Sequence, residues 1–315
     1  MANGEQEEKV AAPAGEHWDR ELVQRLAFQA LREQRRSRRW GIFFKLLFFG
    51  YLVVVLYLAI PADVQVGPHT ALVDVTGVIA EEERASADNL VPALRAAFEH
   101  RRSRGVIIRA NSPGGSPVQA DYLYNEIMRL RAEYPDKPVY AVVTDICASA
   151  CYYVASAADR IYANPASLVG SIGVLYDGFG FTGLMDNVGV ERRLITAGQN
   201  KGMLDPFSPL KEEDRRHLEG MLDEIHRQFV QAVKNGRGDR LAQDDTLFSG
   251  LFWNGERARQ LGLVDDFASP GTVAREIIGA DEVVDYTPQP DFFQRLSEEF
   301  GVGVARVFQP SSPLR

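Results

Sequence analysis

The chain has 315 residues, of which 45% are hydrophobic and 25% are charged, as is typical of one or two globular domains. Its formal net charge of −8 argues against a nucleic-acid partner, because proteins that bind nucleic acids present a basic surface. Two cysteines are too few for a disulfide framework.

The chain begins with a polar, charged segment, residues 1–40, in which Glu21 to Glu33 has the apolar spacing of an amphipathic helix. The basic stretch Arg35 to Arg39 precedes an apolar run, residues 41–60, whose only charge is Lys45. Twenty helical residues span about 30 Å, the thickness of the hydrocarbon core of a bilayer. A buried helix is the alternative, but the length and the basic flank favour a single transmembrane anchor. The arginines then place the tail in the cytoplasm and the rest of the chain outside.

Residues 61–287 alternate between apolar strand-like runs and helical segments, which predicts an α/β fold with a mostly parallel sheet. The predicted strands are Ala71 to Ile79, Gly105 to Ala110, Pro138 to Val143, Asp159 to Tyr162 and Ser167 to Val174. The predicted helices are Ser86 to His100, Val118 to Ala132, Glu212 to Asn235, Trp253 to Leu261 and Thr272 to Ile278. Residues 288–315 are a C-terminal tail of uncertain order.

Ser149 lies where the third predicted strand turns into a helix. A helix N-terminus offers unpaired N–H groups and the positive end of its dipole to an oxyanion, so a serine there is well placed as a nucleophile. The alternative is a serine that only caps the helix. Cys147 and Cys151 flank it, and in a helix they would lie one turn apart, beyond ideal disulfide reach. We therefore expect both cysteines to be buried packing residues, and two thiols alone are too few for a metal site.

A second turn, Asn-Ser-Pro-Gly-Gly-Ser from Asn111 to Ser116, follows the second predicted strand. Gly114 and Gly115 permit positive φ and leave bare N–H groups that can point into a cleft, as an oxyanion hole requires. An ordinary strand-to-helix turn is the alternative. Because neighbouring parallel strands end at the same edge of a sheet, we expect this turn to lie beside Ser149.

A nucleophilic serine needs a base. None of the histidines stands at a strand end or in a glycine-rich turn, which disfavours a histidine base without excluding one. The five histidines are His17, His69, His100, His217 and His226. Lys201, in the loop from Thr196 to Phe207, is the other candidate. A lysine acts as a base only in its neutral form, which burial favours, whereas the common fate of a loop lysine is to be solvated.

Five signatures in this order resemble the signal peptide peptidase A family of membrane-anchored serine proteases (peptidase family S49), including its SohB-like members, in the Clp protease/crotonase superfamily. The signatures are Asn111 to Gly115, Asp145 to Tyr153, Gly170 to Val174, Thr196 to Lys201 with Pro206 and Phe207, and Trp253 to Asp265. The resemblance runs from about Ala71 to Phe267 and implies a repeated ββα ectodomain behind one N-terminal transmembrane helix.

The resemblance also implies roles for individual residues. Ser149 matches the family's nucleophile, Lys201 its general base, and Ser171 the serine that orients the lysine. Gly114 and the N–H of Ala150 match the oxyanion hole. The family usually has Ser-Gly-Gly-Tyr-Tyr where this chain has Ser-Ala-Cys-Tyr-Tyr. Ala150 and the cysteine after it do not readily take positive φ, so the backbone there is expected to be helical or the fit to be altered.

The function implied is a membrane-bound serine endopeptidase with a Ser-Lys dyad that degrades cleaved signal peptides or membrane-protein fragments. Its catalytic domain is expected on the periplasmic face of a bacterial inner membrane, in a homo-oligomeric ring, with no metal, nucleotide or other cofactor. Whether Lys201 acts within its own subunit stays open. Two alternatives remain: a crotonase-type acyl-CoA enzyme, and a catalytically silent scaffold of the same fold.

Overall fold

The computed structural model describes residues 36, 38–55 and 67–289. The chain divides into two compact units, Met1–Gln65 and Val66–Arg315. In the first unit, residues 38–55 are helical. Among the described residues, no helix is both long and apolar enough to cross a membrane. The last five residues of the expected anchor, the predicted amphipathic helix and nearly all of the C-terminal tail lie outside the described residues.

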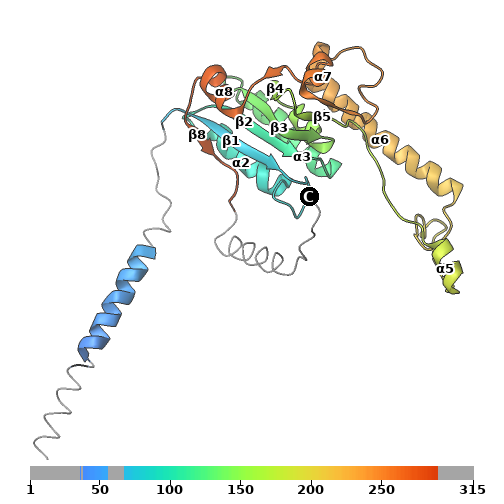
Figure 1. The fold of residues 1–315 in the computed structure, drawn as a ribbon, viewed down its shortest axis with the longest axis horizontal. Coiled ribbons are helices and arrows are strands. Elements are labelled where there is room, and N and C mark those ends of the chain that lie inside the picture. Colours follow the sequence, from blue (N-terminus) through green and yellow to red (C-terminus); the bar gives the residue numbers. More distant parts are fainter. Residues whose placement is uncertain (1–35, 37, 56–66, 290–315) are drawn as a thin grey trace, which may run out of the picture. The chain divides into compact units, whose positions relative to one another are not determined.

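The second unit is built on an eight-stranded sheet whose main path has the order β6-β5-β3-β2-β1-β8 (Figure 1). Among the described strands, β5 and β6 pair in antiparallel fashion and every other pairing is parallel. The strands on this path are β1 (His69–Thr76), β2 (Ser103–Ser112), β3 (Val139–Ala148), β5 (Leu168–Gly170), β6 (Phe252–Asn254) and β8 (Val283–Asp285). The mixed α/β fold with a mostly parallel sheet is confirmed.

The sheet divides along β3, which pairs with a different strand in each half. The first half of β3 pairs with β4 (Arg160–Ala163), which continues to β7 (Asp266–Phe267), and the second half pairs with β5. In this second pairing Cys147 lies opposite Val169, and Ala148 lies opposite Gly170. The residues that follow these two strands, Ser149 and Ser171, therefore leave the sheet at the same step of the register.

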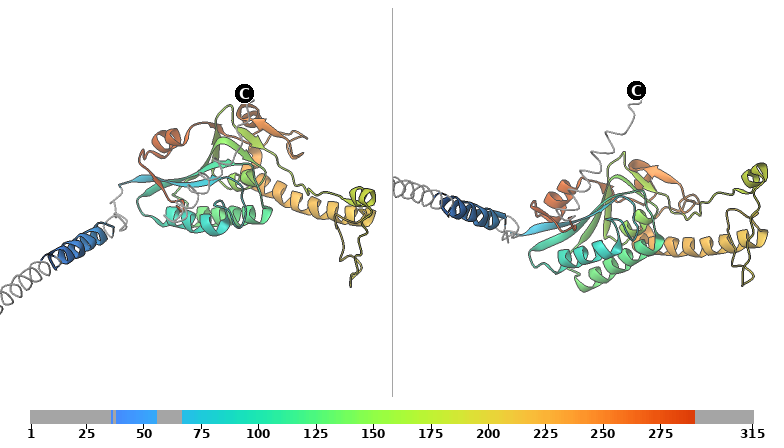
Figure 2. Two further views of the ribbon diagram at one scale, coloured as in Figure 1. Left: turned by 60° about the horizontal axis from the view of Figure 1, so that its bottom comes forward. Right: turned by 90° about the horizontal axis from the view of Figure 1, so that it is seen from below.

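Helices cover the sheet on both faces (Figure 2). The larger core lies under α2 (Ala87–Glu99), α3 (Pro117–Glu133) and α4 (Ala150–Ala155), and alternate residues of β1, such as Ala71 and Val73, point into it. Leu72 of the same strand points to a smaller cluster on the other face, together with Val273 of the π-helix η2 (Val273–Ile278). A short helix, α8 (Pro270–Thr272), precedes η2.

The remaining helices are α5 (Thr182–Val188), α6 (Glu212–Arg237) and α7 (Gly255–Gln260), with a 3-10 turn, η1 (Gly238–Arg240), after α6. The C-terminal part of α6 packs on the body, whereas its N-terminal part and the segment with α5 extend away from the sheet (Figures 1 and 2). This projecting segment, residues 174–211, is called the arm below.

The predicted elements differ from the observed ones mainly where tertiary contacts act. β3 continues five residues past the predicted end, to Ala148, because β5 pairs with its extension. The predicted helix from Trp253 begins instead as strand β6, because Val169 of β5 pairs with Trp253, and α7 starts only at Gly255. The predicted strand from Ser167 ends early, at Gly170.

Candidate active site

Ser149 is the single residue between β3 and α4. Its backbone has φ 54° and ψ −125°, a conformation that costs a non-glycine residue about 1–3 kcal/mol. Its N–H donates to the carbonyl of Gly170 at 2.8 Å, which fixes the turn to the end of β5. Its side chain makes no capping hydrogen bond to α4, so the alternative that it only caps the helix is not supported. A strained serine turn is a feature that clusters at functional sites.

The two cysteines around Ser149 form a disulfide bond, which corrects the expectation that they only fill space. That expectation assumed a continuous helix. Cys147 lies instead in strand β3 and Cys151 in helix α4, and the sharp turn at Ser149 brings their α-carbons to 5.1 Å. Ala150 and Cys151 are helical, which is the first of the two expected outcomes, and of these three consecutive residues only Ser149 has positive φ.

The glycine turn packs directly against the serine turn, as expected from the parallel strands. Gly114 has φ +109°, and a Cβ placed on it would lie 2.8 Å from the Cβ of Ser149 and 2.9 Å from the carbonyl oxygen of Ala148. Only glycine fits here. The N–H of Gly114 donates to the hydroxyl of Ser112 at 3.1 Å, whereas Gly115 lines the cavity beside Ser149. The Ala150 N–H belongs to the first turn of α4, where helix N–H groups have no partner within the helix.

Ser171 lies beside Ser149 in the same cavity. It follows β5 directly, has φ 53°, and its N–H donates to the carbonyl of Leu251 at 2.7 Å. The two serines thus stand on equivalent turns at the carboxyl ends of adjacent strands. This edge is where ligands bind in parallel α/β sheets.

Lys201 is not brought to Ser149 within one chain. It lies exposed in the arm and does not line the cavity. The arm carries large apolar side chains that are mostly exposed to solvent: Leu175, Phe179 and Ile195 are 80%, 75% and 95% exposed. Surfaces of this kind mark interaction sites in soluble domains.

Among the histidines, His226 comes near the site, because its Nε2 lies 3.2 Å from the carbonyl oxygen of Ile172, the neighbour of Ser171. His226 does not line the cavity. His69 begins β1, at the opposite end of the parallel strands, where its Nε2 lies 2.9 Å from the hydroxyl of Tyr286. Within the described residues, no group of three or more His, Cys, Asp or Glu side chains is arranged to hold a metal ion.

The cavity beside Ser149 has a volume of about 690 Å³. Val118 of α3 and Ile225 and Phe229 of α6 give it apolar walls, and Tyr153 of α4 stacks on Phe229 with ring centroids 5.0 Å apart. Asp121 is the one charged residue that the described part of the chain contributes to its lining. Asp121 and Phe229 are not among the site residues predicted from the sequence, although Asp121 lies one turn into the helix that follows the glycine turn.

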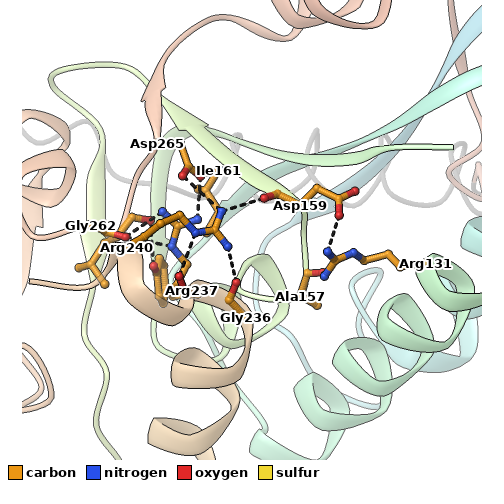
Figure 3. Close-up of polar contacts among 11 residues, drawn as sticks. Arg131, Ala157, Asp159, Ile161, Gly236, Arg237, Arg240, Gly262 and Asp265 are labelled. Carbon is orange, nitrogen blue, oxygen red and sulfur yellow. Dashed lines mark hydrogen bonds and ion pairs between the residues drawn. The ribbon is translucent and has the colours of Figure 1, made fainter. Parts of the chain in front are cut away.

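The wall formed by α6 is held by a buried ion pair (Figure 3). Arg237, only 1% exposed, pairs with Asp265 at 2.7 Å and donates two hydrogen bonds to the carbonyl of Gly262. Asp265 also accepts the N–H of Ile161 in β4 at 2.7 Å. Burial acts to raise the pKa of Asp265, but the hydrogen bond and charge of Arg237 outweigh it and lower the pKa overall. Gly236 of α6 allows a close approach to the residue that follows α4, since a Cβ there would lie 1.9 Å from the carbonyl oxygen of Ser156.

Comparison with known proteins identifies a family that fits this geometry. The sequence profile described as peptidase family S49 matches residues 131–280, which include the Ser149 turn and Ser171. A protein of Synechocystis sp. named as a candidate protease is 31% identical over 195 residues, which cover 62% of this chain and 68% of that protein. Protease 4 of Haemophilus influenzae is 30% identical over 203 residues, 63% of this chain and 32% of that protein.

A relative of higher identity has a different name. A protein of Brucella melitensis named Na(+)/H(+) antiporter NhaA is 45% identical over 186 residues. These residues make up 59% of this chain, and the chain spans only 25% of that protein's length. The family profile and the protease of Synechocystis, matched over more than two thirds of its length, show that this chain belongs to peptidase family S49.

Proposed function

We propose that this protein is a membrane-anchored serine endopeptidase that degrades cleaved signal peptides or membrane-protein fragments. The observation that carries the proposal is Ser149 itself. It stands on a strained strand-to-helix turn without a capping bond, lines a cavity, and packs against a glycine turn that tolerates no side chain. Such a turn holds a nucleophile exposed, with backbone N–H groups nearby for the oxyanion. Within the Clp protease/crotonase superfamily, the favoured chemistry is therefore acyl transfer to serine.

In the proposed mechanism, neutral Lys201 takes the proton from Ser149 Oγ while the oxygen attacks the scissile carbonyl. The N–H of Ala150 and an N–H of the pair Gly114–Gly115 stabilise the tetrahedral oxyanion. The protonated lysine then gives its proton to the leaving amine, and water hydrolyses the ester by the same path. Ser171 orients the lysine. For Gly114 to donate, its N–H must leave the Ser112 hydroxyl, whereas Gly115 already lines the cavity.

We propose that Lys201 reaches Ser149 of a neighbouring subunit in a homo-oligomeric ring. The exposed apolar residues of the arm support this arrangement, because burial against another subunit would remove them from water. Mixing Ser149→Ala and Lys201→Ala subunits tests it. Restored activity in mixed rings is expected for a shared site, and two inactive variants that stay inactive when mixed would contradict it.

We further propose that residues 41–60 anchor the protein in the inner membrane and that residues after Pro61 lie in the periplasm. The disulfide between Cys147 and Cys151 supports an oxidising compartment, since disulfides are rare in the cytosol. Protease added to spheroplasts should digest the C-terminal domain and spare residues 1–40. Digestion of the N-terminal tail alone would reverse the assignment.

The decisive experiment is labelling of the full-length protein with a serine-reactive peptidyl phosphonate, followed by mapping of the modified residue. Ser149 should carry the label, and Ser149→Ala should lose both labelling and cleavage of peptides with small or apolar residues before the scissile bond. Ser249→Ala removes another serine hydroxyl of the same cavity, so it is the matched control and should still be labelled. A folded, oligomeric wild-type protein that is neither labelled nor active would support a silent scaffold.

A further inference from the structure

The cavity beside Ser149 has an unusual combination of walls and charge. Val118, Ile225 and Phe229 make its sides apolar, and among the described residues Asp121 of α3 is the one carboxylate in its lining. In the part of the chain that the structure describes, no lysine, arginine or histidine lines the cavity. An aliphatic substrate side chain would leave this partly buried carboxylate beside apolar groups, with no counter-charge from the lining of the cavity itself, which is unfavourable.

Asp121 is held in place by neutral partners. The hydroxyl of Tyr153 donates to its Oδ1 at 3.0 Å, and the amide of Asn125 donates to its Oδ2 at 2.9 Å. Burial raises the pKa of Tyr153, and the hydrogen bond to Asp121 raises it further, so the phenol stays protonated as the donor. The ion pairs formed by neighbouring residues of α3, such as Glu126 with Arg129, do not include Asp121. A carboxylate oxygen has more than one acceptor site, so each Asp121 oxygen retains capacity for a cationic donor.

A second hollow adjoins the cavity and shares Asp121 and Tyr153 with it. This second hollow is lined by Glu224 and Arg227 of α6, and neither residue lines the cavity beside Ser149. Glu224 is therefore a carboxylate close to the site but outside the cavity, which makes it a natural control.

We propose that Asp121 is a specificity-determining residue, and that the cavity beside Ser149 binds a lysine or arginine side chain of the substrate. The apolar stem of such a side chain lies along Val118, Ile225 and Phe229, and its cationic end pairs with the Asp121 carboxylate. The stacked rings of Tyr153 and Phe229 give a further surface that suits a cation. The proposal rests on the proposed peptidase function and adds a basic residue to a substrate that is otherwise small or apolar near the scissile bond.

The test uses the full-length protein and matched fluorogenic peptides that carry lysine, acetyl-lysine or norleucine at one of the three positions before the scissile bond. At one position the wild type should prefer lysine over norleucine by about fivefold to tenfold in kcat/KM, the range for a partly exposed charged hydrogen bond. Acetyl-lysine, which has the stem without the charge, should behave like norleucine. The lysine preference should also weaken at high salt.

Asp121→Asn keeps an oxygen that accepts from Tyr153 and removes the charge, so its lysine preference should fall to about onefold. Glu224→Gln should keep the wild-type ratio. Because each ratio comes from a single enzyme preparation, a smaller folded fraction does not change it, and the acetyl-lysine comparison needs no variant. A wild-type enzyme that cleaves all three peptides equally, or an Asp121→Asn enzyme that keeps the preference, would overturn the inference alone. Absence of any cleavage would overturn the peptidase function and this inference together.

Discussion

Replacing Gly114 by alanine puts a methyl group against the turn that carries Ser149. The added Cβ would lie 2.8 Å from the Cβ of Ser149, whereas non-bonded carbon atoms settle about 3.5–4.0 Å apart. It would also meet the carbonyl oxygen of Ala148 at 2.9 Å and the Ala150 nitrogen at 3.1 Å. One of the two turns must therefore move by about 1 Å, a displacement that can cost about 100-fold in rate at a catalytic group.

The variant Gly279→Ala is a control that separates the overlap with Ser149 from the cost of positive φ alone. Gly279 also has positive φ, +78°, but a Cβ on it would meet nothing within 4 Å. In both variants the positive φ alone costs about 1–2 kcal/mol, and each 1 kcal/mol lowers the melting temperature of a domain of this size by about 2–4 °C. Gly114→Ala should lose further stability to the overlap unless the turns relax.

The assay combines thermal unfolding with the rate of phosphonate labelling at Ser149 and kcat/KM on a fluorogenic peptide. We expect Gly279→Ala to keep wild-type activity and Gly114→Ala to lose about 100-fold or more at a temperature where both are folded. If Gly114→Ala keeps more than about a third of the wild-type activity, the position of Ser149 does not depend on the glycine turn.

Further predictions concern the base, the disulfide and an ion-pair cluster. Lys201→Ala should abolish turnover because it removes the amine, and Lys201→Arg should do so because guanidinium stays protonated, whereas Ser171→Ala should leave partial activity. Near-native rates for Lys201→Arg at neutral pH would exclude Lys201 as the base. Replacing Cys147 and Cys151 together by alanine opens a loop of five residues that the disulfide closes. The free energy of unfolding, measured in urea against the oxidised wild type, should fall by about 2 kcal/mol. An unchanged unfolding midpoint would mean that the disulfide contributes nothing to stability. Hydrogen bonds from the guanidinium groups of Arg129 and then Arg95 lower the pKa of Glu126 to about 2. The ionised Glu126 therefore stabilises the fold fully above about pH 5, and this stabilisation is lost as the pH falls toward 2. Between about pH 5 and pH 2 the free energy of unfolding of Glu126→Gln should fall by about 1 kcal/mol less than that of the wild type. The effect is small because both arginines are half-exposed.

The sequence alone determined the features that depend on local pattern. Hydrophobic periodicity was sufficient to predict the alternating strands and helices as far as β3. Small residues after two of these strands predicted the turns at Gly114 and Ser149. Parallel topology then placed both turns at one edge of the sheet, because strands connected by helices end on the same side. The five signatures, in their order along the chain, were sufficient to predict the peptidase family to which the chain belongs.

Only the tertiary structure decided the features that depend on partners far apart in the chain. Because β5 pairs with the end of β3, that strand is longer than predicted and the chain turns sharply at Ser149. This turn brings Cys147 and Cys151 together in a disulfide, whereas the continuous helix expected from the sequence would have separated them. The same pairing puts Ser171 beside Ser149. Asp121 enters the cavity because α3, α4 and α6 pack together, while Lys201 stays on the arm, away from its expected partner. Such positions follow from non-local packing, which sets a residue's neighbours without leaving a periodic trace in the sequence around it.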